Sequence, residues 1–306
     1  METRLLEYVV AVAQEGGFTR AAQRCHAAQS TVSAGIRALE SELGVVLFER
    51  DTRRVVLTPT GAAVVPLARE LLDQLGRLRD AASDDGVLRG TLRVGTLTNV
   101  VPGMRLSTVL GRFQSRHPGV DLQLSPSPTG SAGLARDLAD GRIDLAFLGG
   151  APMPHAELEA ERLGRSVFVA ILPLGHPLAE REIVPLAELV RLPFIDSPQG
   201  FGNRTALDSA IGARGLARRT TIEIGDVAQM PLFVAAGLGV AVMPRSLVPS
   251  GVAGVDLHPI DTLIEWELLV ATRRRPSAAA KALRAAIAGE FAAESPVQSP
   301  VQSPVE

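Results

Sequence analysis

The 306-residue sequence predicts a multidomain protein with a small helical N-terminal domain, one long helix and a larger α/β part. Short amphipathic runs fill most of residues 1–60, and a repeat of apolar residues three and four apart follows them. From residue 91, strand-like and helix-like stretches alternate, which is typical of α/β domains. A chain of this length is expected to form two or three domains.

The first elements predict a winged helix-turn-helix. Residues 3–16 place apolar side chains at helical spacing and stop at Gly16. A second helix is expected from Thr19, whose side chain can cap it, and a third from Gln29 to Gly44. The stretch VVLFERDTRRVVLTPTG then predicts two short strands around a charged turn. Three helices and a small hairpin make this motif.

A long helix is expected to begin at Thr58 and Pro59, a capping side chain followed by proline at the first helical position. Its apolar repeat predicts a seam against a partner helix, although a single helix packed on its own domain is the alternative. Pro66 is expected to bend the first turns, and SDDG at 83–86 is interpreted as a hinge. The predicted dimerisation residues are Val64, Ala68, Leu71, Leu75 and Leu78.

The α/β part contains about eight strand-like stretches, and their alternation with helices predicts largely parallel sheets. This number of strands fits two small lobes better than one sheet. The stretches are TLRVGT, VDLQLS, IDLAFLG, VFVAIL, PFIDS, TIEIG, GVAVMP and WELLVAT. The end of the chain repeats SPVQ without bulky core-forming residues, which predicts a disordered tail.

These patterns place the domain boundaries. We expect a DNA-binding domain at 1–58, a linker and dimerisation helix with a hinge at 59–88, a two-lobed domain at 89–292 and the tail at 293–306. Lobe I is expected to combine 89–163 with 271–292, and lobe II to span 164–270.

Composition limits the function classes. The net charge of −2 argues against a uniformly basic nucleic-acid coat, so any basic face must come from separation of charges in space. The N-terminal stretch METRLLEYVVAVAQEGG does not fit a signal peptide, and no apolar run approaches the ~18 residues of a membrane span. The single cysteine, Cys25, cannot form an internal disulfide, which is typical of a reduced, cytoplasmic protein.

Four blocks of sequence resemble the LysR-type transcriptional regulators, in the expected order and over nearly everything before the tail. FTRAAQRCHAAQSTVSAGIRALESELGVVLFER, followed by LTPTG, resembles the family's helix-turn-helix block and the start of its linker helix. HPGVDLQL, LADGRIDLAF and VAAGLGVAVMP resemble its effector-domain blocks. One block alone is weak, because helix-turn-helix look-alikes are common, but four in order are specific.

The resemblance implies a cytoplasmic regulator whose effector domain has a periplasmic-binding-protein-like, two-lobed fold. Its implied partners are double-stranded promoter DNA, a small-molecule effector, further copies of the chain in a homodimer or homotetramer, and RNA polymerase. It implies no membrane partner and no cofactor.

The polar start of the third helix suits a recognition helix, which enters the major groove N-terminus first and needs short hydrogen-bonding side chains there. Gln29 can pair with an adenine edge, while the alternative for Ser30 and Thr31 is that they merely cap the helix. Where the family commonly has Ser-Arg-Gln-Ile, this sequence lacks the base-reading arginine at Ala34. Gly35 is expected to weaken the helix by ~1 kcal/mol relative to alanine.

DNA contact is therefore expected to rest on the helix start, Arg37 and the wing. The predicted contacts are Gln29, Ser30, Thr31, Ser33, Arg37, Arg53 and Arg54, and Arg20, Arg24 and Arg50 are further phosphate candidates.

The resemblance also implies an effector cleft lined by helix N-termini, whose unpaired N–H groups and positive dipoles suit an anionic ligand. Each polar residue carried over to this cleft can instead be an ordinary helix cap. The implied residues are Thr96, Thr98, Asn99, Thr129, Gly130, Ser131, Phe201, Asn203 and Asp226. Thiol-based sensing in the family uses cysteines of the effector domain, whereas Cys25 matches a core position of the second helix, so a structural thiol is expected.

Two rival classes fit less well. An enzyme would need a convergent catalytic set, but the five histidines are far apart and no metal-binding, GxSxG or GxGxxG pattern occurs, so no catalytic residue or metal is expected. A cytoplasmic solute-binding or sensory protein that does not bind DNA is the main alternative. Both rivals leave residues 1–60 unexplained.

Overall fold

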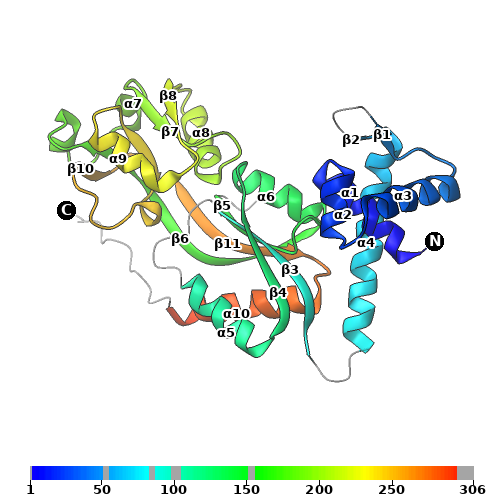
Figure 1. Cartoon of the computed structure of the whole chain (residues 1–306). Coiled ribbons are helices and arrows are strands. Elements are labelled where there is room, and N and C mark those ends of the chain that lie inside the picture. Colours follow the sequence, from blue (N-terminus) through cyan, green and yellow to red (C-terminus); the bar gives the residue numbers. More distant parts are fainter. Residues whose placement is uncertain (1, 51–54, 83–86, 98–104, 151–155, 295–306) are drawn as a thin grey trace. The chain divides into compact units, whose positions relative to one another are not determined.

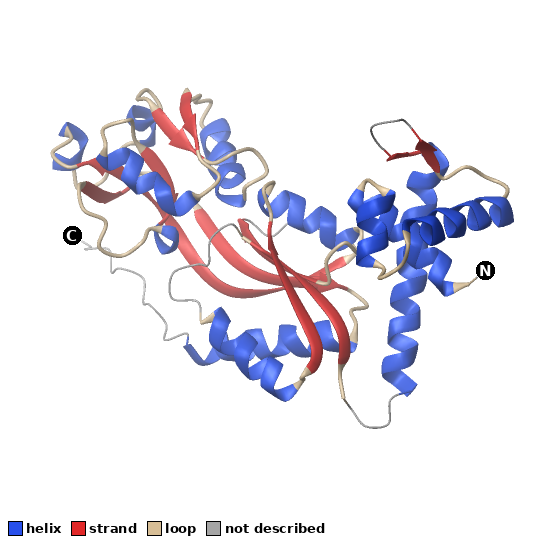
Figure 2. Cartoon of the chain, in the orientation of Figure 1, coloured by secondary structure: helices blue, strands red, loops and turns tan. Residues whose placement is uncertain are grey.

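The computed structural model describes residues 2–50, 55–82, 87–97, 105–150 and 156–294 (Figures 1 and 2). The chain divides into two compact units, with the main boundary between Leu88 and Arg89. The N-terminal unit and the C-terminal unit are described separately.

The N-terminal unit is a winged helix-turn-helix, as predicted. Its helices are α1 (Thr3–Glu15), α2 (Phe18–Arg24), α3 (Gln29–Leu43) and α4 (Pro59–Ala82), and the strands β1 (Phe48–Arg50) and β2 (Val55–Leu57) pair antiparallel. Left-handed glycines end α1 and α3, with φ of +61° at Gly16 and +69° at Gly44. The predicted cap by Thr19 is wrong, because α2 begins at Phe18 with Gly17 at the N-cap position and no side-chain cap.

The core of this unit is built around α1. Val9 and Val12 of α1 and Ile36 and Leu39 of α3 are completely buried, so the periodic apolar faces read from the sequence meet each other. Leu47, Phe48, Val65 and Ala68 bring the wing and the first half of α4 into the same cluster.

The junction between the wing and α4 is fixed by Thr58. Its Oγ1 accepts a hydrogen bond from the Gly61 amide at 2.9 Å and donates one to the Val46 carbonyl at 2.7 Å. The predicted cap at Thr58 is therefore confirmed. Gly61 packs against the Leu47 carbonyl so closely that a Cβ there would overlap the oxygen. Pro66 lies inside α4 at an exposed position.

The C-terminal unit contains a seven-stranded sheet in the order β10-β6-β11-β5-β3-β4, with β9 also paired to β6. The strands are β3 (Arg89–Thr96), β4 (Gly119–Pro126), β5 (Leu145–Gly150), β6 (Leu158–Pro173), β9 (Ala241–Pro244), β10 (Val255–Pro259) and β11 (Glu265–Arg273).

The prediction of largely parallel sheets is wrong. Every stretch predicted as a strand contains one, but β3 pairs parallel with β4 and β5, whereas β6, β9, β10 and β11 pair antiparallel. The cause is the long strand β6, whose first half was missed in the sequence, and the missed strand β10. Both enter the sheet without a crossover helix, which parallel neighbours would require.

The unit has two lobes, which the long strand β6 joins. Lobe I contains β3 to β5 with α5 (Leu106–Arg116), α6 (Gly130–Ala139) and α10 (Ala278–Glu294). Lobe II contains β9 and β10, the parallel pair β7 (Phe194–Asp196) and β8 (Thr220–Glu223), and the helices α7 (Leu186–Leu189), α8 (Gly202–Ala213) and α9 (Met230–Ala235). Strand β6 pairs with β11 up to Val167 and with β9 and β10 from Phe168, so it runs through both lobes (Figure 1). None of the described helices combines the length and apolar character of a membrane-spanning helix.

Gly35 is a packing residue, which corrects its interpretation as a weak point of the recognition helix. It is buried in α3, and a Cβ on it would lie 2.7 Å from Cδ2 of Tyr8 and 3.1 Å from Cδ2 of Leu5, both on α1. Since Tyr8 is itself 4% exposed, its ring has little room to move aside.

We therefore predict that Gly35→Ala destabilises the N-terminal unit by about 1–3 kcal/mol through overpacking, although alanine is the better helix former. Gly76→Ala on α4 is the matched control, because a Cβ there meets nothing within 4 Å. The control should stabilise its helix by about 0.5–1 kcal/mol. Thermal unfolding followed by the near-ultraviolet signal of Tyr8, the single tyrosine, measures both. Equal stabilisation by the two variants would contradict the packing role.

Candidate DNA interface and effector cleft

The start of α3 presents polar side chains to the outside. Gln29, Ser30 and Thr31 are exposed, whereas Val32 and Ile36 are buried in the core. Ala28 occupies the N-cap position without a side-chain cap, so the alternative that Ser30 and Thr31 merely cap the helix is wrong. Ser33 lies on the same side and is half-buried.

The arginines named from the sequence fall into three groups. Arg37 is exposed on α3 and has no ion-pair partner among the described residues. Arg24 forms an ion pair with Glu15 at 3.1 Å, and Nε of Arg20 donates to the carbonyl of the same residue at 3.0 Å. Arg53 and Arg54 lie outside the described residues, as does the side chain of Arg50. Of the predicted DNA-contacting arginines that the structure describes, Arg37 is thus the one without an ion-pair partner.

Cys25 is half-buried at the end of α2 and packs against the core. Burial raises the pKa of its thiol, which lowers the fraction of reactive thiolate. Both observations fit a structural thiol.

The apolar residues of α4 divide between two faces. Ala68 is 2% exposed and Val64 packs partly buried against the same core, so the chain itself covers these two members of the predicted seam. Leu71 is 41% exposed and Leu78 is 65% exposed. Leu67 lies one turn before Leu71 and is 60% exposed. The sequence analysis missed it, although it precedes Leu71 by four residues and Leu78 by eleven, which places all three on one helix face. Leu67, Leu71, Leu75 and Leu78 are called the α4 stripe below.

The effector cleft predicted from the sequence corresponds to the place where lobe I meets lobe II. The Ala132 amide in α6 donates to the Gly200 carbonyl before α8 at 3.0 Å, which brings the first turns of the two helices together. Thr96 ends β3 beside this junction, since its carbonyl accepts the Ser127 amide at 3.1 Å. The structure thus gathers Thr96, Thr129, Gly130, Ser131, Phe201 and Asn203, while Thr98 and Asn99 lie outside the described residues.

Some predicted cleft side chains already have protein partners. The Ser131 hydroxyl donates to the Gly149 carbonyl at 2.8 Å and accepts from the Gly149 amide at 2.9 Å. Asp226 accepts from the Ala228 amide at 3.2 Å and caps a short 3-10 helix, Val227–Gln229. These two residues act as structural side chains in this state of the protein.

One other polar side chain near the cleft is buried without such a partner. Ser197 is completely buried, and its hydroxyl has no hydrogen-bond partner among the described residues. Burying a polar group without a partner is costly, so the Ser197 hydroxyl is a candidate for a ligand contact. Asn203, in the first turn of α8, is 6% exposed. Ser197 was missed in the sequence, although it directly follows the buried strand β7, where α/β ligand sites often lie.

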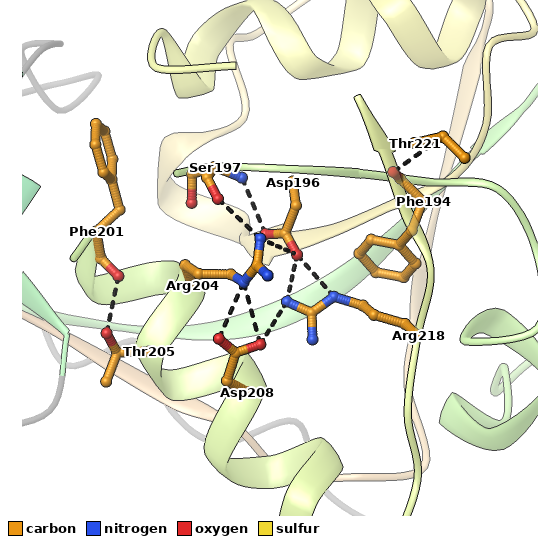
Figure 3. Close-up of polar contacts among 9 residues, drawn as sticks. All are labelled: Phe194, Asp196, Ser197, Phe201, Arg204, Thr205, Asp208, Arg218 and Thr221. Atoms are coloured by element: carbon orange, nitrogen blue, oxygen red, sulfur yellow. Dashed lines mark hydrogen bonds and ion pairs between the residues drawn. The ribbon is translucent and has the colours of Figure 1, made fainter. Parts of the chain in front are cut away.

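A buried ion cluster lies beneath this loop (Figure 3). Asp196 is 2% exposed and accepts a hydrogen bond from Nε of Arg218 at 2.7 Å. Its carboxylate also lies 3.3 Å from the Arg204 guanidinium. Asp208 accepts from both arginines and balances the charge, and Arg218 also lies over the Phe194 ring, 5.2 Å from its centroid. Burial raises the pKa of Asp196, and the positive charge of Arg218 opposes that shift.

The same cluster positions the loop at 197–201. The Ser197 amide donates to Oδ1 of Asp196 at 2.9 Å, and Arg204 donates to the Ser197 carbonyl at 3.1 Å. The loop that carries Gly200 and Phe201 into the cleft is therefore anchored to buried charges at its first residue.

We predict that Arg218→Ala destabilises the C-terminal unit by about 3–5 kcal/mol, because it leaves Asp196 buried without its main partner. The control is Arg214→Ala, which breaks an exposed ion pair with Asp261 at 3.3 Å and should cost about 0–1 kcal/mol. Urea unfolding followed by Trp266, the single tryptophan and part of this unit, measures both. Similar losses of unfolding free energy in the two variants would show that the buried cluster contributes no more to stability than an exposed ion pair.

Together, the two units define a class of protein. A helix-turn-helix whose third helix has a polar outer face, followed by a two-lobed α/β domain, is the organisation of a transcription regulator with an effector domain.

Comparison with known families identifies this regulator more closely. Residues 3–62 match the bacterial regulatory helix-turn-helix protein of the lysR family, and residues 85–292 match the LysR substrate binding domain. The chain belongs to the LysR family of DNA-binding transcriptional regulators.

Similar proteins are regulators as well. The chain is 30% identical to the RuBisCO operon transcriptional regulator of Allochromatium vinosum, over 94% of this chain and 95% of that protein. It is 36% identical to a probable hydrogen peroxide-inducible genes activator of Mycobacterium avium, over 80% and 78% of the two chains. A full-length OxyR variant from Pseudomonas aeruginosa has a TM-score of 0.75 at 26% identity and covers 95% of this chain and 94% of its own. CbnR, solved in complex with its target DNA, shares the fold, with a TM-score of 0.59, 23% identity and coverage of 95% and 100%.

Proposed function

We propose that this regulator binds promoter DNA sequence-specifically by placing the start of α3 in the major groove. The observation that carries this proposal is the division of α3 into a buried face and an outer face formed by Gln29, Ser30, Thr31, Ser33 and Arg37. The wing arginines Arg53 and Arg54 are proposed to follow the phosphate backbone or to enter the minor groove.

We also propose the domain organisation expected from the sequence, with boundaries after residues 58, 88 and 292. Because its DNA target lies in the bacterial cytoplasm, the protein is proposed to act there, and contact with RNA polymerase stays a prediction.

Arg37→Ala should weaken operator binding and reduce the slope of log affinity against log salt by about one, as expected for the loss of one phosphate contact. The measurement is a gel shift or fluorescence anisotropy titration on the protein's own promoter region at several salt concentrations. Arg191→Ala is the control, because it removes an equally exposed arginine from lobe II. An unchanged salt slope for Arg37→Ala, or the same loss in the control, would overturn the assignment of Arg37.

We propose that two chains associate through the α4 stripe. Three of its four leucines are exposed and recur at the spacing of one helix face, and such a stripe needs a partner helix to remove it from water. Pairing through α4 presents two recognition helices to successive turns of the duplex. Assembly of such dimers into tetramers through the effector domains is part of the same proposal.

The double variant Leu71→Glu, Leu78→Glu should be a monomer, because the glutamates of the two chains would repel each other where the α4 stripes meet. Sedimentation velocity of the full chain measures this. The control is Leu263→Glu, since Leu263 is 77% exposed in lobe II and lies outside the stripe. If the double variant keeps the oligomeric state of the control, the α4 stripe is not the interface.

The effector is proposed to be a small, anionic molecule bound between the lobes. The names of the two relatives refer to the genes that they regulate, a RuBisCO operon and peroxide-inducible genes. The proposed class of effector therefore rests on the residues of the cleft. The support is the meeting of the α6 and α8 N-termini beside the buried, unpartnered hydroxyl of Ser197. Such a ligand would act by binding one lobe arrangement more tightly than another, and thereby change the geometry of DNA binding.

A further inference from the structure

We propose that Gly130, Gly150, Gly200 and Gly202 form an interlobe latch, a contact of backbone against backbone that holds the two lobes together and whose release switches the regulator. The proposal rests on the proposed function, because it concerns the regulation of the same cleft.

The latch has one side on each lobe. Lobe I contributes the first turn of α6 and the end of β5, which the Ser131 hydroxyl ties together through Gly149. Lobe II contributes Gly200 and the first residue of α8, carried on the loop that the Asp196 cluster anchors. The hydrogen bond from the Ala132 amide to the Gly200 carbonyl, at 3.0 Å, joins the two sides.

Each of the four glycines meets backbone of the opposite lobe. A Cβ on Gly130 would lie 2.7 Å from Cα of Phe201, one on Gly150 would lie 2.9 Å from Cα of Gly202, and one on Gly200 would lie 2.8 Å from the Thr129 carbonyl oxygen. A Cβ on Gly202 would overlap the Gly149 carbonyl. Backbone atoms cannot turn aside as a long side chain does, so any side chain at these positions forces the lobes apart.

Strand β6 contains an irregularity a few residues before it enters lobe II. The pairing of β11 with β6 shifts register between Leu268 and Leu269, where Leu268 faces Gly164 and Leu269 faces Arg162. Such a bulge bends a strand and weakens its ladder locally. A Cβ on Gly164 would meet nothing within 4 Å. In this proposal, bending of β6 near the bulge accompanies release of the latch and allows two arrangements of the lobes.

A native fluorophore lies directly behind the latch. Trp266 is 3% exposed and its ring packs on Gly149, with Cε2 2.9 Å and Nε1 3.1 Å from the position of a Cβ on that glycine. Gly149 therefore lies between Trp266 on one side and Gly202 on the other. Opening of the latch should change the environment of the only tryptophan in the chain.

The wedge variant is Gly202→Ala in the full chain, and Gly212→Ala is its control on the same helix, because a Cβ on Gly212 meets nothing within 4 Å. Gly202→Ala should increase acrylamide quenching of Trp266, and the Ala132 amide should exchange its hydrogen about tenfold faster, as expected for local opening. Exchange in β3 and β4 and the far-ultraviolet circular dichroism should stay as in the control, which separates opening from unfolding. Equal quenching and exchange in the two variants would overturn the proposal.

The regulatory role is tested by DNA affinity. The Gly202→Ala chain should differ in affinity for the promoter from the Gly212→Ala chain, whose affinity should equal that of the wild type. Wild-type affinity in both would show that the lobe contact is only structural and would overturn the switching role. If the wild-type chain binds no promoter DNA, the proposed function fails, while quenching and exchange still decide whether the latch exists.

Discussion

The structure depends on a few places where backbone or a ring approaches more closely than any Cβ allows. Gly35 lets α3 pack on Tyr8, and Gly61 lets the start of α4 contact the wing at Leu47. In the C-terminal unit, Gly202 lets α8 contact the end of β5 at Gly149. Each contact fixes a functional element: the recognition helix, the linker helix and the cleft. Packing at these points leaves no room for gradual adjustment, because protein interiors are close-packed.

Buried charge supplies the second fixed point. Asp196 cannot lose Arg218 without a large penalty, and it holds the first residue of the loop that reaches lobe I. The cluster is neutral, since two arginines face two aspartates, so it contributes position and not net charge to the cleft. An anion in this cleft is therefore expected to be recognised by helix N-termini and neutral polar side chains, and not by these arginines.

Local signals predicted the N-terminal unit well because its boundaries are set by local chemistry. Gly16, Gly44 and the Thr58 cap all act within one turn of the chain, and the apolar periodicity of α1 and α3 shows directly which faces are buried. The wrong predictions have a common cause, because each depends on contacts between distant parts of the chain. From the sequence, Gly35 only weakens a helix, whereas in the fold it makes room for Tyr8. Ala68 has the spacing of a dimer seam, but in the fold it belongs to the core around α1. The antiparallel pairing in the sheet depends on the first half of β6 and on β10, neither of which a local sequence pattern predicted.

The candidate cleft shows the same division. The sequence indicated which loops gather there, because each follows a strand or precedes a helix. It did not show which side chains already have partners: Ser131 and Asp226 are hydrogen-bonded to protein, while the hydroxyl of Ser197 is not. Hydrogen-bond satisfaction is a property of the folded neighbourhood and has no signature in a single sequence.

The relative strengths of these contacts decide where the C-terminal unit can move. The neutral hydrogen bond from the Ala132 amide to the Gly200 carbonyl, which joins the lobes, is worth about 0.5–1.5 kcal/mol net. Allosteric couplings are typically about 1–3 kcal/mol, so a ligand with modest preference for one arrangement is able to outweigh it. Breaking the Asp196 cluster would cost about 3–5 kcal/mol. The loop at 197–201 should therefore move with lobe II as one body, and the change in lobe arrangement should be confined to the glycine contact and to β6 near its bulge with β11.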